Sequence, residues 1–485
     1  MGKDLDEIDV AWAWSAYEPT HSTSSGQAHS TSSGQVAQRP WSRRFAAHLY
    51  RRAGFSASWA QLQQSVDEGP AKTLDRLCNP PAVGGDADAG EFDRTAAALA
   101  DRTVASGNPQ QLSAGWLYRM VNTPDPLLEK LTLFWHGHFA TSAAKVTNSS
   151  LMLDQNDLLR AGARGKFQDL VRQVSRDPAM LIYLDSTTNR RIHPNENYGR
   201  ELMELFCLGV GNYSERDIKE VARAFTGWEV LGEKFHFNSA QHDTGPKTIL
   251  GSTGNFDGDD AVRIILAQPA APRFIARKLI RYFLFDEPAG ANLPDEVVEP
   301  VARDLRENGF EIAAVVRRML GSNLFFSDHA IGRKVRSPVD LGVGLLRALG
   351  MSTSLVKLSQ GLSDLGQGLF FPPNVKGWDG GRTWINSATL LGRANLVRQT
   401  LQASETSFDK AGGSLATAAD RAGAATPEQT VDWLRDLLLA VAPPEETRAQ
   451  LARIAARADG GPADRGQRIA QVIHVMSALP EFQLE

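Results

Sequence analysis

The sequence predicts a mainly α-helical globular protein of bundle-like architecture, with a small irregular or β-hairpin lobe near residues 230–258. Two observations lead to this prediction. In most of the chain, apolar residues recur three and four positions apart, which is the spacing of an amphipathic helix. Between residues 230 and 258 this period is lost and several glycines occur, a pattern that favours a hairpin or an irregular lobe. Apolar heptads are not sustained, so a coiled coil is not expected.

The composition is that of an ordinary folded protein, with 42% hydrophobic and 22% charged residues. Because 485 residues exceed one simple core, we expect a flexible tail over 1–40, a helical core over 41–400 that carries the functional site, and a helical region over 401–485 packed on that core. The net charge of -4 argues against nucleic acid as a partner. No stretch approaches the roughly 20 apolar residues of a membrane span.

Cysteine usage and the start of the sequence bear on the compartment. Cys78 and Cys207 lie far apart in different kinds of segment, so neither a disulfide framework nor a cysteine-based metal site is indicated. The first six residues are acidic and have no apolar stretch behind a basic head, so no signal peptide is expected. We therefore expect a cytoplasmic protein, or one that is exported together with a signal-bearing partner.

In the first half of the chain, the elements follow from local signals. The sequence His-Ser-Thr-Ser-Ser-Gly-Gln occurs twice between residues 21 and 35, and such small polar residues bury too little apolar surface to order a segment. Helices are expected from Trp41 to about Cys78 and again up to about Asn122. Pro126 is typical of the first turn of a further helix. The remaining helices of this half are expected within 154–177 and 195–207.

The second half begins with a helix whose predicted N-cap is Ser214, with Asp217 at the third helical position. After the glycine-containing lobe, helical spacing returns, and residues 361–386 are rich in loop-forming residues. The chain from 388 to 479 is helical again, interrupted by Gly-Gly and Pro-Pro pairs. Helices between the lobe and this loop are expected near 259–268, 270–284, 295–307, 310–320 and 336–349.

The first candidate site is the segment Phe134-Trp135-His136-Gly137-His138-Phe139. Two histidines two positions apart point to the same side only if the backbone is extended, and Gly137 weakens the continuation of a helix. We therefore expect His136 and His138 to be metal ligands. In the alternative interpretation, one histidine caps the preceding helix and the other is a hydrogen-bonded core group.

The second candidate is the segment from His193 to Leu205. Asn195 or Asn197 can cap a helix on which two glutamates three positions apart share a face, and the surrounding leucines place at least one carboxylate near the core. Such a carboxylate needs a cation, a metal ion or a raised pKa, although an arginine can satisfy it in a purely structural pair. The candidate catalytic residues here are Glu196, Arg200, Glu201 and Glu204, and the candidate substrate-binding residues are His193 and Asn197.

The third candidate is the dipeptide His242-Asp243, in a loop with glycine and proline. His242 is expected to be a metal ligand or a general base, and Asp243 a catalytic carboxylate. Adjacent residues rarely face one another, so the two are expected to have different partners. A solvated turn is the alternative interpretation.

The fourth candidate is the loop over residues 370–386, in which aromatic residues alternate with proline, glycine and single polar groups. This pattern suits a rigid loop that lines a pocket, or a buried loop that ties two helical layers together. The motifs of nucleotide-binding proteins are missing from the chain, so no nucleotide cofactor is expected. The arginines and lysine of the series 273, 277, 278 and 281 are expected on a solvated face. The candidate substrate-binding residues of the loop are Asn374, Lys376, Trp378 and Arg382.

The chain resembles the large bacterial family named domain of unknown function 1800, from about residue 41 to its closing segment. The resemblance implies no activity, but members are often encoded beside proteins of the 1501 family, which resemble sulfatases and phosphatases and commonly carry twin-arginine export signals. A partner protein encoded nearby is therefore implied. The matching stretches are 48–55, 134–142, 195–209, 213–228, His242-Asp243, 372–386 and 479–482.

These candidates lead to three hypotheses. In the first, the protein is a metal-dependent enzyme, preferably an oxidoreductase acting on a small organic substrate, with iron, manganese or zinc held by the histidines and by one or more carboxylates. In the second, a carboxylate works with His242 in a metal-free hydrolase or lyase on a sugar-like substrate that stacks on Trp378 or Trp384. In the third, the protein is a non-catalytic subunit of a 1501-family-like protein. The first requires the imidazoles near 137 and the acids near 202 to meet.

Overall fold

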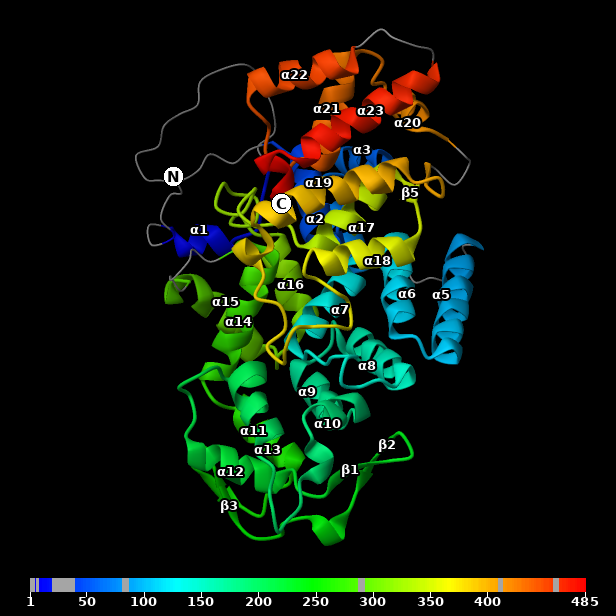
Figure 1. Ribbon diagram of the computed structural model, residues 1–485. Coiled ribbons are helices and arrows are strands. Elements are labelled where there is room, and N and C mark those ends of the chain that lie inside the picture. The colour runs from blue at the N-terminus through cyan, green and yellow to red at the C-terminus, as the bar shows by residue number, and fades with distance from the viewer. Residues whose placement is uncertain are drawn as a thin grey trace.

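Helices make up most of the protein (Figure 1). The computed structural model describes Leu5 and residues 8–19, 40–80, 87–286, 293–408, 413–456 and 462–485. Within these residues there are 23 α-helices and three two-stranded antiparallel sheets, which confirms the predicted mainly α fold. None of the described helices combines the length and the apolar character that crossing a bilayer requires.

The first ten helices extend from the N-terminal segment to the middle of the molecule. Several begin at a side chain that accepts hydrogen bonds from the first-turn amides, such as Asp125 before α7 and Asn148 before α8. Pro126 occupies the first turn of α7, as predicted. The helices are α1 (Val10–Trp14), α2 (Arg43–Gly54), α3 (Trp59–Glu68), α4 (Pro70–Cys78), α5 (Ala87–Ser106), α6 (Pro109–Asn122), α7 (Pro126–His138), α8 (Ser149–Gly162), α9 (Phe167–Ser175) and α10 (Pro178–Tyr183).

The lower end of the molecule in Figure 1 is a lobe of short helices and two hairpins, which confirms the lobe predicted near 230–258. Ser214 caps α12 in a capping box with Asp217, as predicted. A π-helix follows α11 directly. The elements are α11 (Asn197–Glu201), the π-helix (Leu202–Cys207), α12 (Glu215–Ala224), β1 (Trp228–Leu231), β2 (Lys234–Phe237), β3 (Lys247–Ile249), β4 (Ser252–Gly254) and α13 (Gly258–Leu266).

The remaining helices return to the middle and upper parts of the molecule. Those predicted between 270 and 349 are present with boundaries shifted by at most two residues. The elements are α14 (Ala270–Phe283), α15 (Asp295–Glu307), α16 (Ile312–Leu320), α17 (Pro338–Leu349), β5 (Met351–Ser352), α18 (Leu355–Asp364), α19 (Ser387–Gln402), β6 (Ser407–Phe408), α20 (Leu415–Arg421), α21 (Pro427–Leu438), α22 (Glu445–Ala455) and α23 (Pro462–Ser477). Short 3₁₀ turns are Ser186–Thr188, Ser239–Gln241, Gly381–Trp384 and Pro480–Gln483.

The predicted flexible tail over 1–40 is wrong for residues 8–19, which the structure describes. Residues 10–14 form the helix α1, in which Trp14 is buried and its indole N–H donates to the Val297 carbonyl at 3.1 Å. Asp9 caps this helix through the amides of Ala11 and Trp12. Burial of a large aromatic side chain helps to order so short a segment. The duplicated polar stretch, with His21 and His29, lies outside the described residues.

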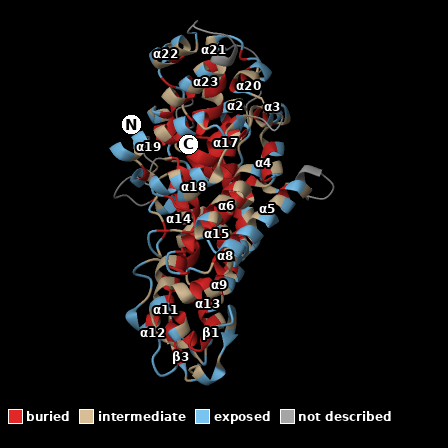
Figure 2. Cartoon of the chain, turned by 45° about the vertical axis from the view of Figure 1, so that its right-hand side comes forward, coloured by how far each residue is buried: buried red, intermediate tan, exposed pale blue. Residues whose placement is uncertain are grey.

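One contiguous apolar core joins most of the helices. Figure 2 shows the buried residues concentrated along the long axis of the molecule, with exposed residues on its outer faces. The last residues of the chain enter this core, because Phe482 is fully buried and the Arg52 guanidinium donates to the Glu485 carbonyl at 2.5 Å. The core therefore connects the first helices with the end of the chain.

Candidate functional site

The C-terminal end of α7 gathers several of the predicted candidates. The helix continues through Gly137 to His138, so the extended backbone predicted for this segment is wrong. On a helix, side chains two positions apart point about 200° away from each other. His136 and His138 are 1% and 3% exposed and face different neighbours. Burial on both sides stabilises the last turn despite the glycine, and the two imidazoles do not form a chelating pair.

His136 holds the loop that follows α18. Its Nε2 accepts a hydrogen bond from the Phe370 amide at 3.1 Å, and its ring lies 5.1 Å from the ring of Trp116 and 5.7 Å from that of Trp378. Phe370 has a φ of 66°, a left-handed conformation that few non-glycine residues adopt. Burial lowers the pKa of His136 to about 3, so the ring is a neutral acceptor. This histidine is a hydrogen-bonded core group, as in the alternative interpretation of the pair.

His138 faces the opposite side of α7, among aromatic rings of α7, α9 and the π-helix. Its Nδ1 lies 3.0 Å from the Nζ of Lys278, on α14. Burial, followed by the charge of Lys278, holds the pKa of His138 well below its usual range. A neutral imidazole that accepts at Nδ1 carries its proton on Nε2. Among the described residues this buried Nε2 has no partner within hydrogen-bond distance, although the nearby Phe206 backbone acts to raise the pKa of His138. The surrounding rings are Phe134, Trp135, Phe139, Phe167, Phe206 and Phe274.

Lys278 links α7 to the π-helix. Besides its contact with His138, the half-buried Lys278 donates from Nζ to the Leu205 carbonyl at 3.1 Å. Carbonyls in the last turn of a helix lack intrahelical partners and are free to accept such bonds. Within the described residues, no carboxylate pairs with this lysine. The amine therefore sits between a neutral ring and a peptide oxygen, without a counter-charge.

The surroundings of Lys278 favour its uncharged form. Burial lowers the pKa of Lys278 to about 7, and the positive charges of Arg281 and Lys376 act in the same direction, whereas Cys207 opposes them. The protonated amine has three hydrogens, of which two are used by His138 and Leu205. Loss of the third proton leaves both hydrogen bonds intact and creates a lone pair in the remaining direction. Such an amine is able to act as a base or as a nucleophile near neutral pH.

The predicted carboxylates lie beside this cluster but are not bonded to it. Glu204 accepts from the Tyr213 hydroxyl at 2.7 Å. Burial, and then the charge of Glu204, raises the pKa of Glu201. Arg200 pairs with Glu215 at 2.8 Å and with Glu196 at 3.4 Å.

The start of the helix in this segment also differs from the prediction. Glu196 occupies the N-cap of α11 and makes no side-chain cap. Asn195 instead accepts from the amide of Asn197 at 3.0 Å, in a local turn. His193 and Asn197 are exposed. These residues shape the surface next to α12.

His242 and Asp243 belong to the lobe with the hairpins, at the lower end of the molecule in Figure 1. Asp243 receives two hydrogen bonds from Arg223, at 2.7 and 3.1 Å, which lower the pKa of that carboxyl. His242 Nδ1 lies 2.9 Å from the Thr226 carbonyl. The two residues have different partners, as predicted, but they are half-buried and fasten the loop to the end of α12. The predicted convergence with His136 and His138 is not found.

The described part of the chain contains no group of three or more His, Cys, Asp or Glu side chains placed to hold a metal ion. The physical reason is the helical geometry of α7, which separates the imidazoles, together with the hydrogen bonds that engage the nearby acids. In this arrangement His136 and His138 act as acceptors for an amide and an amine.

The loop over 370–386 covers the end of α7. Gly377 has a φ of 83°, and a Cβ there would lie 2.3 Å from the Gly137 carbonyl oxygen, so only glycine permits this approach. Trp378 rests against His136, as a pocket-lining or tying residue of the loop would. Lys376 is exposed and pairs with Asp379 at 2.6 Å. The other predicted binding residues, Asn374 and Arg382, are exposed, and Trp384 is buried.

Comparison with known proteins assigns the family. The sequence matches the family described as protein of unknown function (DUF1800) over residues 48–484, nearly the whole chain. The chain belongs to this family. No curated protein and no solved structure matches it. The family resemblance inferred from the motifs is thereby confirmed.

Lys278 is the residue of this DUF1800 protein that sequence reasoning missed. Its helical series was expected on a solvated face, and this holds for Arg273, which pairs with Glu299. Lys278 instead turns inward, with its Nζ 4.9 Å from the Phe274 ring centroid. The available signal was the position of Lys278 four residues after Phe274, because residues at this spacing share a helix face.

Proposed function

We propose that this DUF1800 protein is an enzyme that removes a proton next to a carbonyl group in a small organic substrate, with the uncharged amine of Lys278 as the base. The observation that supports this proposal is that the Lys278 amine contacts a neutral imidazole and a peptide carbonyl. Among the described residues, the buried Lys130 and Lys334 have carboxylate partners, whereas the buried Lys247 donates only to peptide carbonyls. Lys130 pairs with Asp340, and Lys334 lies 3.4 Å from a Glu485 oxygen. A lysine without such a partner is costly to enclose, which supports a functional role.

The neighbours of Lys278 have distinct roles in this proposal. His138 and the Leu205 carbonyl orient the amine, and the charges of Arg281 and Lys376 help to keep it unprotonated. An amine with a pKa near the working pH combines a useful uncharged fraction with adequate basicity. The same two cations favour a substrate that carries a negative group.

This proposal departs from the metal-dependent oxidoreductase expected from the sequence. That hypothesis drew its support from imidazoles and carboxylates meeting in one space, whereas His138 is engaged by an amine. The proposal keeps the acid–base chemistry of the second hypothesis and transfers the role of the base from the glutamates and His242 to Lys278. Glu201 and Glu204 remain neighbours on the π-helix and the adjoining turn of α11.

The test follows proton removal directly. Wild-type protein is incubated in D₂O with a set of small 2-oxo and 2-hydroxy acids, and the exchange of carbon-bound hydrogen is followed by NMR. We expect exchange that the Lys278→Met variant reduces by at least about 100-fold, the usual contribution of a general base. Lys357→Met, which removes an exposed lysine paired with Glu405, serves as the matched control and retains the exchange. Equal exchange by wild type and Lys278→Met, or no exchange by either, would contradict the proposal.

A second measurement tests whether the amine of Lys278 is uncharged near neutral pH. Each lysine is labelled with a trace of acetic anhydride between pH 6 and 10, and its reactivity is quantified by mass spectrometry. The reactivity of Lys278 should reach half of its maximum near pH 7, the pKa to which burial lowers it. A lysine side chain in a model peptide reaches this point near pH 10. A midpoint for Lys278 near pH 10 would remove the basis of the proposal.

A further inference from the structure

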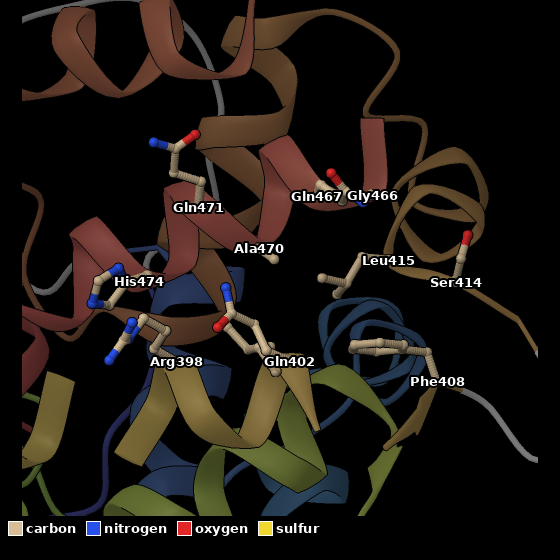
Figure 3. Close-up of a pocket in the computed structure, with 11 residues that line it drawn as sticks. Arg398, Gln402, Phe408, Ser414, Leu415, Gly466, Gln467, Ala470, Gln471 and His474 are labelled. Atoms are coloured by element: carbon tan, nitrogen blue, oxygen red, sulfur yellow. The ribbon is translucent and has the colours of Figure 1, made fainter. Parts of the chain in front are cut away.

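A pocket of about 740 Å³ lies between α19 and α23, in the upper part of the molecule and away from α7 (Figures 1 and 3). The strand β6 and the start of α20 close one side of this pocket. Its volume falls in the range of small-molecule sites. Nothing in the proposed function uses this pocket.

The pocket has polar side chains along both helices. On α19, Arg398 and Gln402 are four residues apart and therefore share a face. On α23, Gln467, Gln471 and His474 follow the same helical spacing, and Figure 3 shows Arg398, Gln402 and His474 at one end of the pocket. Amide, imidazole and guanidinium groups from two helices thus converge on one space.

The floor of the pocket is apolar. Leu401 and Leu415 are buried side chains of α19 and α20, and Phe408 and Ala470 extend the apolar surface toward α23. A ligand that fits here needs a hydrocarbon part for the floor and a polar part for the two helices.

The charge of the lining indicates the sign of the polar part. Among the described residues, no aspartate or glutamate lines the pocket, and the exposed side chain of Arg398 and the half-buried side chain of His474 have no hydrogen bond or ion pair. Two other arginines of this region have acidic partners, because Arg465 pairs with Asp420 and Arg448 pairs with Asp432. An arginine that faces a hollow and has no described acid partner is available to pair with an anion from outside the chain.

We propose that this pocket binds a small organic carboxylate with a hydrocarbon chain, whose carboxylate is held by Arg398 and whose chain lies on Leu401, Phe408 and Leu415. Guanidinium and carboxylate match in a two-bond geometry, and His474 adds a third donor from α23. Burial of each methylene group on the floor adds affinity independently of the charge. The anionic head and the apolar chain are therefore separable in an experiment.

The test compares octanoate with 1-octanol, which has the same chain length and no charge, by titration calorimetry on the full chain. Octanoate should bind at least about tenfold more tightly than 1-octanol, since hydrogen bonds to charged groups contribute about 1.5–3 kcal/mol. Arg398→Ala should remove this difference and leave 1-octanol binding within about twofold. Arg453→Ala, which removes an exposed arginine of α22, is the matched control and should retain it.

A second variant tests the floor. Ala470→Trp fills the pocket and should abolish binding of both compounds, while circular dichroism checks that the helices remain. Equal affinity for octanoate and 1-octanol in the wild type, or octanoate binding that survives both Arg398→Ala and Ala470→Trp, would overturn the proposal. Lys278→Met should bind octanoate like the wild type, so this result is independent of the proposed catalysis.

Discussion

Lys278 makes the stability of the protein depend on pH in a direction that follows from its pKa of about 7. Between about pH 7 and 10 the folded protein holds this amine uncharged, whereas the unfolded chain keeps it protonated. The unfolded state then binds more protons, so the free energy of unfolding rises with pH across this window, by at most about 1.4 kcal/mol per pH unit. The free-energy cost of holding a protonated Lys278 amine in the folded protein is complete below pH 7. This cost is relieved as the pH approaches 10.

Urea denaturation at pH 7, 8 and 9 measures this effect as a difference between variants. Stability of the wild type should rise relative to Lys278→Met over this range, because methionine has no proton to lose. Lys357→Met should follow the wild type, since that lysine is exposed. Parallel pH profiles for wild type and Lys278→Met would show that Lys278 remains charged in the folded protein.

Lys130 illustrates the opposite case, a buried lysine with a full set of partners. It is 1% exposed and pairs with Asp340, which also accepts from the Ser337 hydroxyl at 2.8 Å. Lys130→Met should destabilise the protein by about 3–5 kcal/mol, because it leaves the Asp340 carboxylate buried with less compensation. The double variant Lys130→Met/Asp340→Asn should recover part of this loss in thermal denaturation. A double variant less stable than Lys130→Met would contradict this account.

At the residue scale, the sequence drew attention to His136 and His138 but did not indicate their partners. The spacing of residues on one helix reports which of them share a face. It does not report which distant segment covers that face, and Lys278 lies 140 positions after His138. The predicted metal site has the same weakness, since it requires knowledge of which side chains from separate helices point inward.

At the element scale, the sequence predicted most helices because their signals are local. The capping box of Ser214 and Asp217 and the first-turn position of Pro126 involve only neighbouring residues. The end of α7 was predicted wrongly because Gly137 disfavours a helix when considered alone. In the folded protein, the backbone of Gly377 packs closely on the Gly137 carbonyl, and packing outweighs the intrinsic preference.

The pair Gly137 and Gly377 offers a matched test of this explanation. Gly377→Ala should destabilise the protein by about 2–4 kcal/mol, since its φ is 83° and the new Cβ would collide with the Gly137 carbonyl. Gly137→Ala should be neutral or stabilising by up to about 1 kcal/mol, because its Cβ would lie 3.9 Å from Trp378 and alanine favours the helix. Thermal denaturation ranks the two variants. The reverse order would mean that the loop does not rest on α7.

At the scale of the whole molecule, residues 480–485 pack against helices from the first part of the sequence. Phe482 is fully buried and lies under the Arg336 guanidinium, 5.0 Å from the ring centroid. Arg336 also donates from its amide to the Gln483 carbonyl at 2.8 Å. The sequence indicated helices between 388 and 479, but contacts between residues more than 400 positions apart leave no local periodicity. Only the tertiary arrangement reveals that residues 480–485 connect α2, the segment just before α17, and α19.

Glu485 is the residue through which this connection is tested most directly. Its side chain is 1% exposed and lies near Lys334 and Arg52. Burial alone would lower the pKa of Lys334, but the negative charges of Glu485, Asp286 and Asp340 outweigh it and raise the pKa. Glu485→Gln keeps the shape of the side chain and removes its charge, so the cations lose part of their compensation in a low-dielectric core. We expect the variant to lose about 3 kcal/mol of stability.

The matched control is Glu481→Gln, the same change four residues earlier at a half-buried side chain, which should alter stability by no more than about 0.5 kcal/mol. Limited trypsin digestion adds a spatial readout to thermal denaturation. Because the end of the chain bridges helices from both ends of the sequence, Glu485→Gln should accelerate cleavage in α2 and in α19 together, whereas a purely local role would accelerate cleavage only near residue 485. Equal stability and equal cleavage for the two variants would mean that the charge of Glu485 does not hold these helices together.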